Sequence, residues 1–169
     1  VVFVLNKFFN DGLLPRIKVY VYSPLAVNAT DIFRMHLDLM NEDVKREIKE
    51  GDHDPFGFNN LIYIKKVEQS KELNELNEPC IIISASGMAE AGRIKHHIAN
   101  NISNPHNTIM LVGYCSPTSL GARIQEPDLK EISIFGKMHD VKARITRMEA
   151  FSGHGDYNEM KSFLECQKK

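Results

Sequence analysis

Continuous apolar runs alternate along the chain with segments in which apolar residues recur every three or four positions. A short, continuously apolar run is typical of a strand covered on both faces, whereas the wider spacing predicts an amphipathic helix. The predicted strands are residues 18–25, 61–66, 80–85 and 108–114. The predicted helices are residues 1–9, 29–50, 70–77, 88–101 and 120–125. This alternation predicts an α/β fold with a mostly parallel sheet flanked by helices on both faces.

The pattern changes in the last third of the chain. Residues 132–135 and 141–148 predict the two strands of a β-hairpin, with residues 136–140 as its turn. In the second of these strands, apolar Val141, Ala143 and Ile145 alternate with polar residues, so one face is expected to contact solvent. Residues 157–167 predict a final amphipathic helix. The expected α/β fold therefore carries a late β-hairpin and a C-terminal helix.

The composition excludes several classes of protein. Of the 169 residues, 43% are hydrophobic and 25% are charged, with 21 basic and 22 acidic residues. The net charge of −1 argues against a basic arm that holds nucleic acid by bulk charge, and the apolar content argues against a disordered chain. No apolar run approaches the roughly 20 residues of a membrane span, so we expect no membrane partner. Cys80, Cys115 and Cys166 form no zinc or disulfide pattern; they fit a reducing compartment, and we expect a cytoplasmic location.

Candidate ligand-binding residues lie where the predicted strands end. Ligands of an open parallel sheet gather beyond the carboxyl ends of its strands. Ser84, Ser86 and Gly87 follow one buried strand, and Ser119 follows another. Hydroxyl groups and backbone N–H groups at such a position suit phosphate oxygens. The alternative interpretation of Ser86 and Ser119 is that each caps the N-terminus of the helix that follows it.

Arg123 and His154 are further candidates on residue type and position. Arg123 lies one turn into the short helix after Ser119, where it can reach an anion held by the preceding loop; the alternative is a surface ion pair with Glu126. His154 stands between two glycines after a predicted strand, so its imidazole can project into a cleft, or it can hydrogen-bond a neighbouring loop. The adjacent His96 and His97 point about 100° apart on a helix, so they cannot share one metal, and one of them is expected to pack inside.

Residues 84–124, SASGMAEAGRIKHHIANNISNPHNTIMLVGYCSPTSLGARI, closely resemble the β-CASP domain of metallo-β-lactamase-fold ribonucleases. Within that family the resemblance is to the bacterial and archaeal proteins similar to the pre-mRNA 3′-end-processing endonuclease. The segments KVYVYSPLAVNATDIF (18–33) and IFGKMHDVKARITRMEAFSGHGDYNEM (134–160) match in the same order. The resemblance implies a Rossmann-like β-CASP domain over residues 1–151, without its first strand, and the truncated start of a return into the metallo-β-lactamase-like domain over residues 152–169. Val1, in place of a methionine, fits a piece of a longer chain.

The resemblance implies that the parent protein hydrolyses RNA phosphodiester bonds, with two zinc ions in its metallo-β-lactamase-like domain. The β-CASP domain of this family caps that site and helps to form the RNA groove, so RNA and the metallo-β-lactamase-like domain of the same parent chain are the implied partners. The family's F-S-x-H segment corresponds to residues 151–154. Its histidine lies beside the scissile phosphate and binds no zinc, which makes His154 the expected catalytic residue. The resemblance also supports Ser84, Ser86 and Gly87 as contacts to RNA phosphate.

The family's metal ligands have no counterpart in this sequence. The HxHxDH motif and the later histidine and aspartate ligands are absent. We therefore expect the chain by itself to hold no zinc, to cleave no RNA and, with a net charge of −1, to bind RNA only weakly. One alternative is a non-catalytic RNA-binding or assembly module whose parent has lost its metal site. Another is a Rossmann-like small-molecule enzyme, against which no predicted strand is followed by GxGxxG.

Overall fold

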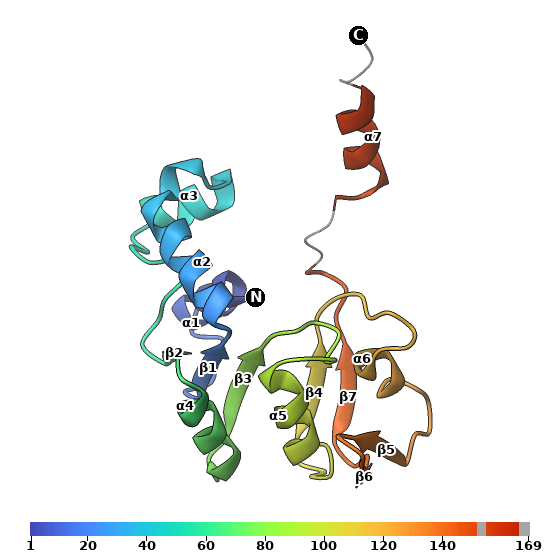
Figure 1. Ribbon diagram of the computed structural model, residues 1–169. Helices are drawn as coiled ribbons and strands as arrows, with labels where there is room; N and C mark the ends of the chain where they lie inside the picture. Colours follow the sequence, from blue (N-terminus) through green and yellow to red (C-terminus); the bar gives the residue numbers. More distant parts are fainter. Residues whose placement is uncertain (152–154, 166–169) are drawn as a thin grey trace. The chain divides into compact units, whose positions relative to one another are not determined.

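The computed structural model describes residues 1–151 and 155–165 (Figure 1). The chain divides into two compact units. The first comprises Val1–Ser86 and Ala91–His97, and the second comprises Gly87–Glu90 and Ile98–Lys169. Among the helices described, none is long and apolar enough to cross a membrane.

The first unit is built on a three-stranded parallel sheet with the order β2-β1-β3 (Figure 1). The strands are β1 (Lys18–Tyr22), β2 (Leu61–Ile64) and β3 (Cys80–Ser84). Tyr22, the last residue of the central strand, pairs with Ile64 on one side and with Ser84 on the other. The carboxyl ends of all three strands therefore lie level at one edge of the sheet. Four of the five residues of β1 are buried, because a strand lies on each side of it.

Helical segments alternate with the strands of the first unit, and Leu73 of one of them packs against the sheet. One core cluster joins Tyr20 and Tyr22 of β1 to Ile64 and Leu73, with Cys80 and Ile82 of β3 packed against it. Since successive side chains of a strand point to opposite faces, this cluster defines one face of the sheet. The helical elements are α1 (Val2–Asn10), α2 (Pro24–Met35), η1 (Leu37–Leu39), α3 (Glu42–Lys49), α4 (Val67–Glu72) and η2 (Leu73–Glu75), where η marks a 3₁₀ helix.

The single helix predicted over residues 29–50 is wrong, because α2, η1 and α3 occupy this segment. α2 begins earlier, at Pro24, since the Ser23 hydroxyl accepts the Ala26 N–H and proline suits the first turn of a helix. α3 is a new helix, since the Asn41 side chain accepts the Val44 N–H at 3.1 Å. A capping side chain of this kind competes with continuation of the preceding helix. The apolar spacing across the segment therefore predicted one helix and did not indicate the separate starts of α2 at Pro24 and α3 at Glu42.

The second unit contains a parallel pair of strands and a hairpin. β4 (Thr108–Leu111) pairs in parallel with β7 (Arg144–Arg147), and β5 (Glu131–Ile134) pairs in antiparallel fashion with β6 (Lys137–Asp140). Its helices are α6 (Leu120–Arg123) and α7 (Tyr157–Glu165), and α5 (Arg93–Asn101) crosses from the first unit into the second. The side chains buried most deeply in this unit are Ile98, Ile102, Leu120, Ile124 and Ile134.

The hairpin prediction is correct for the first strand and wrong for the second. Phe135 and Gly136 both have positive φ angles, 52° and 74°, which produce a tight two-residue reversal directly after β5. Residues 137–140, predicted as the turn, therefore form the second strand. The chain then leaves the hairpin, and the N–H groups of Lys142 and Ala143 both donate to the Ile102 carbonyl oxygen. This crossing directs residues 144–147 into parallel pairing with β4.

The predicted fold class is confirmed. Strands pair in parallel in both units, helices lie on both sides of the sheet, and a hairpin precedes the C-terminal helix. The strands predicted at residues 18–25, 61–66, 80–85 and 108–114 are all present but shorter. The boundary predicted at residue 151 between two domains stays a prediction.

Within the second unit, residues 87–90 pack against the start of α6. The Gly121 N–H donates to the Met88 carbonyl oxygen at 2.9 Å, and the Leu120 N–H donates to the Glu90 carboxylate. A Cβ atom at Gly121 would lie 2.8 Å from the Cys115 Sγ and 2.9 Å from the Met88 carbonyl oxygen. Only glycine therefore permits this approach of the loop to the helix.

We expect Gly121→Ala to lower the free energy of unfolding by about 1–3 kcal/mol, because the added methyl group overlaps backbone that is already hydrogen-bonded. This loss outweighs the gain of about 1 kcal/mol that alanine brings to a helix. Gly87→Ala is the matched control, since a Cβ at Gly87 meets nothing within 4 Å. Denaturant unfolding of both variants measures the difference. Equal stability of the two would contradict the packing described.

Candidate functional site

Ser84 lies at the carboxyl end of β3, on the face of the sheet that α4 and η2 cover. Residues of β3 alternate between faces, so Ser84 shares the face of Ile82, which packs with Leu73 of η2. Ser84 and Ser86 are both partly exposed, and the Ser84 hydroxyl donates to the Ala85 carbonyl oxygen at 3.3 Å. Part of each serine is therefore accessible to a ligand at this edge.

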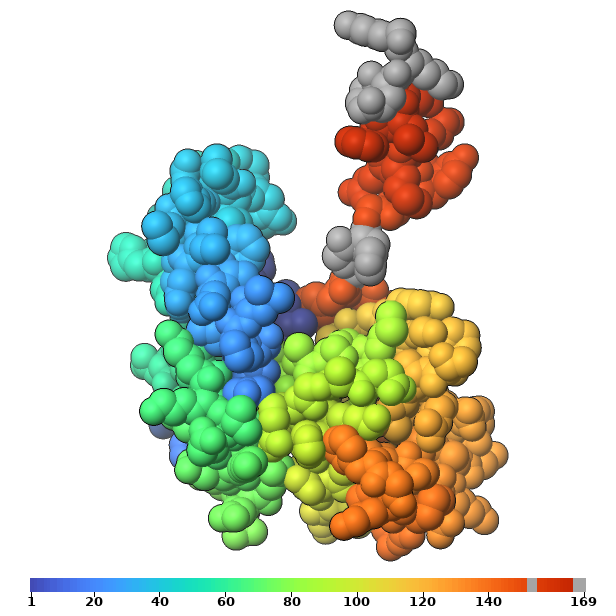
Figure 2. Space-filling model, in the orientation of Figure 1, coloured from blue at the N-terminus to red at the C-terminus, as the bar shows by residue number. Residues whose placement is uncertain are grey.

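The helix predicted to begin at Met88 begins instead at Arg93, at the end of a loop. Ala89 and Gly92 have φ angles of 58° and 74°, which a right-handed helix does not contain. Ser86 is consequently too far from α5 to cap it. A Cβ at Gly92 would lie 3.0 Å from the Ala85 carbonyl oxygen, so the start of α5 passes close to the loop that follows β3. Figure 2 shows this part of the chain, in yellow-green, on the surface.

Ser119 caps the N-terminus of α6. Its Oγ accepts the Ala122 N–H at 3.2 Å and donates to the Ser116 carbonyl oxygen at 2.6 Å, and the residue is 3% exposed. Of the two interpretations left open by the sequence, these contacts fit the helix cap. A contact between Ser119 and RNA stays a prediction.

Arg123 is partly buried in α6, and its Nη2 donates to the Ser133 carbonyl oxygen at 3.5 Å. Within the residues that the structure describes, Arg123 forms no ion pair with Glu126. Arg123, Ser119 and Gly87 belong to the second unit, whereas Ser84 and Ser86 belong to the first. The five candidates therefore divide between the two units.

His154, the predicted catalytic residue, lies outside the described residues. The segment that follows it begins α7, where the Asp156 carboxylate accepts the N–H groups of Asn158 and Glu159 at 2.7 and 2.9 Å. The Asp156 N–H in turn donates to the Glu159 carboxylate at 2.8 Å, which completes a reciprocal cap. Met160 and Leu164, one turn apart on this helix, are both more than half exposed.

A buried hydrogen-bond chain in the first unit links α5 to α4 and η2. The Arg93 Nε donates to the Ser70 Oγ at 3.3 Å, the Ser70 hydroxyl donates to the His97 Nε2 at 3.0 Å, and the His97 Nδ1–H donates to the Asn74 Oδ1 at 3.2 Å. Because an amide oxygen only accepts, the bond to Asn74 assigns a proton to the His97 Nδ1. The low pKa of His97, about 4, leaves the ring neutral at neutral pH, so its Nε2 accepts from the Ser70 hydroxyl.

Burial is the first cause of the lowered pKa of His97, which falls to about 4; the charge of Arg93 lowers it further. Ser70 is fully buried and His97 is 4% exposed, which confirms that one of the two adjacent histidines packs inside. Sequence reasoning missed Arg93, because one arginine at the start of a helix has no distinctive spacing. Its position directly after Gly92, at the end of the loop that follows a predicted strand, was the available signal.

The residues described do not fit a metal site. In residues 1–151 and 155–165, no three His, Cys, Asp or Glu side chains gather as metal ligands. Asp54, in the loop that follows α3, is held by Arg34 through two bonds of 2.9 and 2.8 Å. Asp52 accepts a hydrogen bond from Asn10 at 3.0 Å. These carboxylates fix the loop to α2 and α1.

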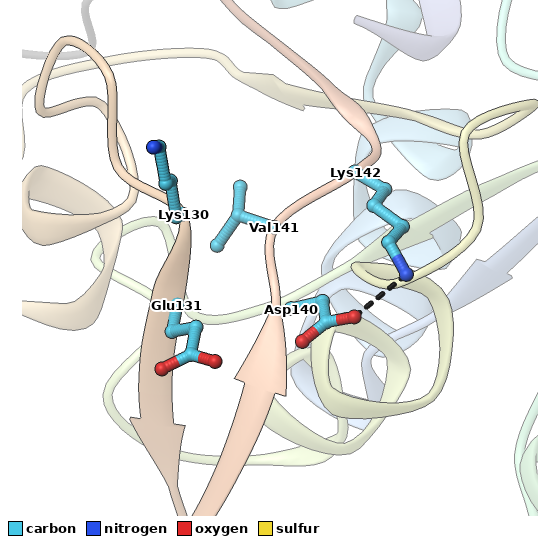
Figure 3. Close-up of a pocket in the computed structure, with 5 residues that line it drawn as sticks. All are labelled: Lys130, Glu131, Asp140, Val141 and Lys142. Atoms are coloured by element: carbon cyan, nitrogen blue, oxygen red, sulfur yellow. Dashed lines mark ion pairs between the residues drawn. The ribbon is translucent and has the colours of Figure 1, made fainter.

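A surface pocket beside the hairpin offers no net charge for a ligand (Figure 3). The Lys142 Nζ lies 2.6 Å from the Asp140 carboxylate, and this hydrogen bond lowers the pKa of Asp140. Two lysines and two carboxylates therefore balance around the pocket. Its lining residues are Lys130, Glu131, Asp140, Val141 and Lys142.

Comparisons with known proteins match two family models to successive parts of the chain. A family model described as the Beta-Casp domain matches residues 1–124, and one described as the Zn-dependent metallo-hydrolase RNA specificity domain matches residues 138–169. A ribonuclease of Thermus thermophilus is 30% identical over 158 residues, which are 92% of this chain and 36% of that relative. An RNase J-like protein of Methanocaldococcus jannaschii is 29% identical over 98% of this chain and 36% of its own length.

A more distant relative is the cleavage and polyadenylation specificity factor 73 of Drosophila melanogaster, 22% identical over 98% of this chain and 23% of its own length. The chain thus spans about a third of the length of the two prokaryotic relatives and about a quarter of the insect one.

The buried His97 predicts a specific dependence of stability on pH. Its pKa is 6.5 in the unfolded chain and about 4 in the folded protein, so the unfolded state binds the extra proton between these values. The stability that His97 contributes is complete above pH 6.5 and is lost as the pH falls toward 4, by about 3 kcal/mol in total. The stability advantage of the wild type over His97→Gln should shrink by that amount.

His53→Gln, at an exposed position, is the control, and denaturant unfolding between pH 6.5 and pH 4 is the measurement. A constant difference between wild type and His97→Gln would contradict the assignment.

Proposed function

Because the chain belongs to the Beta-Casp domain family, whose model matches residues 1–124, we propose that it forms the RNA-contacting part of a metal-dependent ribonuclease. The observation that carries this proposal is the succession of two family matches on one chain, the second described by its RNA specificity. The relatives named as ribonucleases support it. Since this chain spans about a third of their length, the remaining domain of the parent protein supplies the other parts of the enzyme.

The carboxyl edge of the β2-β1-β3 sheet is the proposed RNA contact of the first unit. Ser84 and Ser86 offer hydroxyl groups there. Gly87, the first residue of the second unit, offers exposed backbone that can approach a phosphate closely. In the second unit, Arg123 offers the guanidinium nitrogens not engaged by Ser133. Ser119, whose hydroxyl is already used twice, contributes by holding the loop before α6 in place.

The proposed catalytic contribution of this chain is His154. Its imidazole, placed beside the scissile phosphate, donates a hydrogen bond to a phosphate oxygen or a proton to the leaving oxygen. Zinc supplies the activated water in this class of hydrolase, and its ligands belong to the metallo-β-lactamase-like domain of the parent chain, since the residues described here do not fit a metal site. The chain by itself is therefore inactive in this proposal.

Replacement of His154 by alanine tests the proposed role in the intact protein that carries this chain. We expect turnover to fall by about 10²–10⁴-fold, because a group that transfers a proton in the transition state contributes on that order. The dissociation constant for RNA should change much less, since the role acts at the reacting phosphate. Single-turnover cleavage and RNA binding, measured separately, give the two quantities.

His53→Ala is the matched control, because His53 lies on an exposed loop of the first unit. It should leave both quantities close to those of the wild type. Equal losses of turnover and RNA affinity in His154→Ala would point to a packing role for His154 and contradict the proposal.

A further inference from the structure

We infer that Arg93 binds a backbone phosphate of RNA and that Ser70, His97 and Asn74 are positioning residues that hold its guanidinium. This inference rests on the proposed function, because it names a contact made by the same edge of the sheet. Neither the sequence motifs nor the family resemblance singled out Arg93.

Arg93 begins α5 immediately beside the loop that follows β3. The residue before it, Gly92, approaches the Ala85 carbonyl oxygen so closely that a Cβ would lie 3.0 Å away. Ala85 separates the two serines proposed to contact phosphate. Arg93 is therefore the next residue in the chain after a glycine that closely approaches the loop proposed to contact RNA.

The side chain of Arg93 lies on the same face of the sheet as Ser84. Its Nε donates to Ser70 of α4, and α4 continues directly into η2, whose Leu73 packs in the core cluster with Ile82. Ser84 follows Ile82 at the next position on that face. Arg93 and Ser84 can therefore both contact a ligand bound at this face of the sheet.

The hydrogen-bond chain holds the Arg93 side chain in place through its Nε and leaves the two Nη groups available to a ligand. Ser70 engages the Nε, and among residues 1–151 and 155–165 no partner engages either Nη group, so the two Nη groups can donate together to the two oxygens of a phosphate. Ser70 is in turn fixed by His97, and His97 by Asn74. A guanidinium held in this way loses less rotamer freedom when it binds than a lysine on a flexible stem does.

The charge distribution supports an anion as the ligand. Five other cations of the first unit are paired: Lys7 with Glu47, Lys18 with Glu78, Arg34 with Asp54, Lys45 with Glu42 and Arg46 with Asp43. In the part of the chain that the structure describes, no carboxylate forms an ion pair with Arg93, nor with Lys65 and Lys66 at the carboxyl end of β2. The neighbouring carboxylates on α4 are Glu68 and Glu72. Burial, followed by the charges of Arg93 and Lys71, lowers the pKa of His96, as expected near excess positive charge.

The test measures binding of a short single-stranded oligouridylate to the full chain at low salt, by NMR titration, for the wild type and three variants. Arg93→Gln should weaken binding about tenfold and reduce the slope of log affinity against log salt by about 0.7, the value for one lost phosphate contact in a single strand. Arg93→Lys should lose part of the affinity, because it keeps the charge without the fork. Arg16→Gln removes the same charge from an exposed residue that precedes β1, at the opposite edge, and should change affinity less than about twofold.

A double-mutant cycle tests the positioning role. Ser70→Ala should weaken RNA binding in the wild-type background and have no further effect in Arg93→Gln, because it acts through Arg93. An equal loss in both backgrounds would assign Ser70 a purely structural role and overturn its part of the inference.

The outcomes separate this inference from the proposed function. If the wild type binds RNA and Arg93→Gln binds equally well, Arg93 is not a phosphate contact, while the proposed function stands. If the wild type shows no RNA binding, the proposed function fails and this contact fails with it. If inorganic phosphate binds the Arg93 site as tightly as the oligonucleotide does, the ligand is a free phosphate compound, and RNA is excluded as the partner of Arg93.

Discussion

The parallel register of β1 with both of its neighbours is the constraint on which the rest of the site depends. Tyr22 pairs with Ile64 and with Ser84, so three strands end at the same level. Every loop that leaves this edge then starts within about one strand spacing, roughly 5 Å, of the next. Residues far apart in the sequence, such as Tyr22 and Ser84, thereby become neighbours in space.

A chain of buried hydrogen bonds holds the Arg93 side chain beside the loop that follows β3. The chain Arg93–Ser70–His97–Asn74 runs from a partly buried cation into the core, and each of its bonds has a defined donor when His97 is neutral. A neutral His97 is required for this order, and the low pKa that burial gives it ensures neutrality. The same residues therefore stabilise the packing of α4 against α5 and fix the guanidinium that begins α5.

Sequence reasoning predicted the strands and the fold class well, since continuous apolar runs have few alternatives in a sheet covered on both faces. It failed where a local cap or an unusual backbone angle decided the outcome: Asn41 started a second helix, and Phe135 adopted a positive φ that its residue type does not favour. It also missed Arg93, whose role depends on a hydrogen bond to Ser70, 23 positions earlier. Partners so far apart leave no periodic signal in the sequence.

Hydrogen–deuterium exchange of the chain with and without saturating single-stranded RNA tests the central claim, that RNA binds at the carboxyl edge of the parallel sheet. The account predicts slower exchange in the segments that follow the three strands, residues 23–26, 65–68 and 85–93, and unchanged exchange in residues 11–17 and 76–79 at the amino ends. Protection at the amino ends or on the β5–β6 hairpin, with none at residues 85–93, would contradict it.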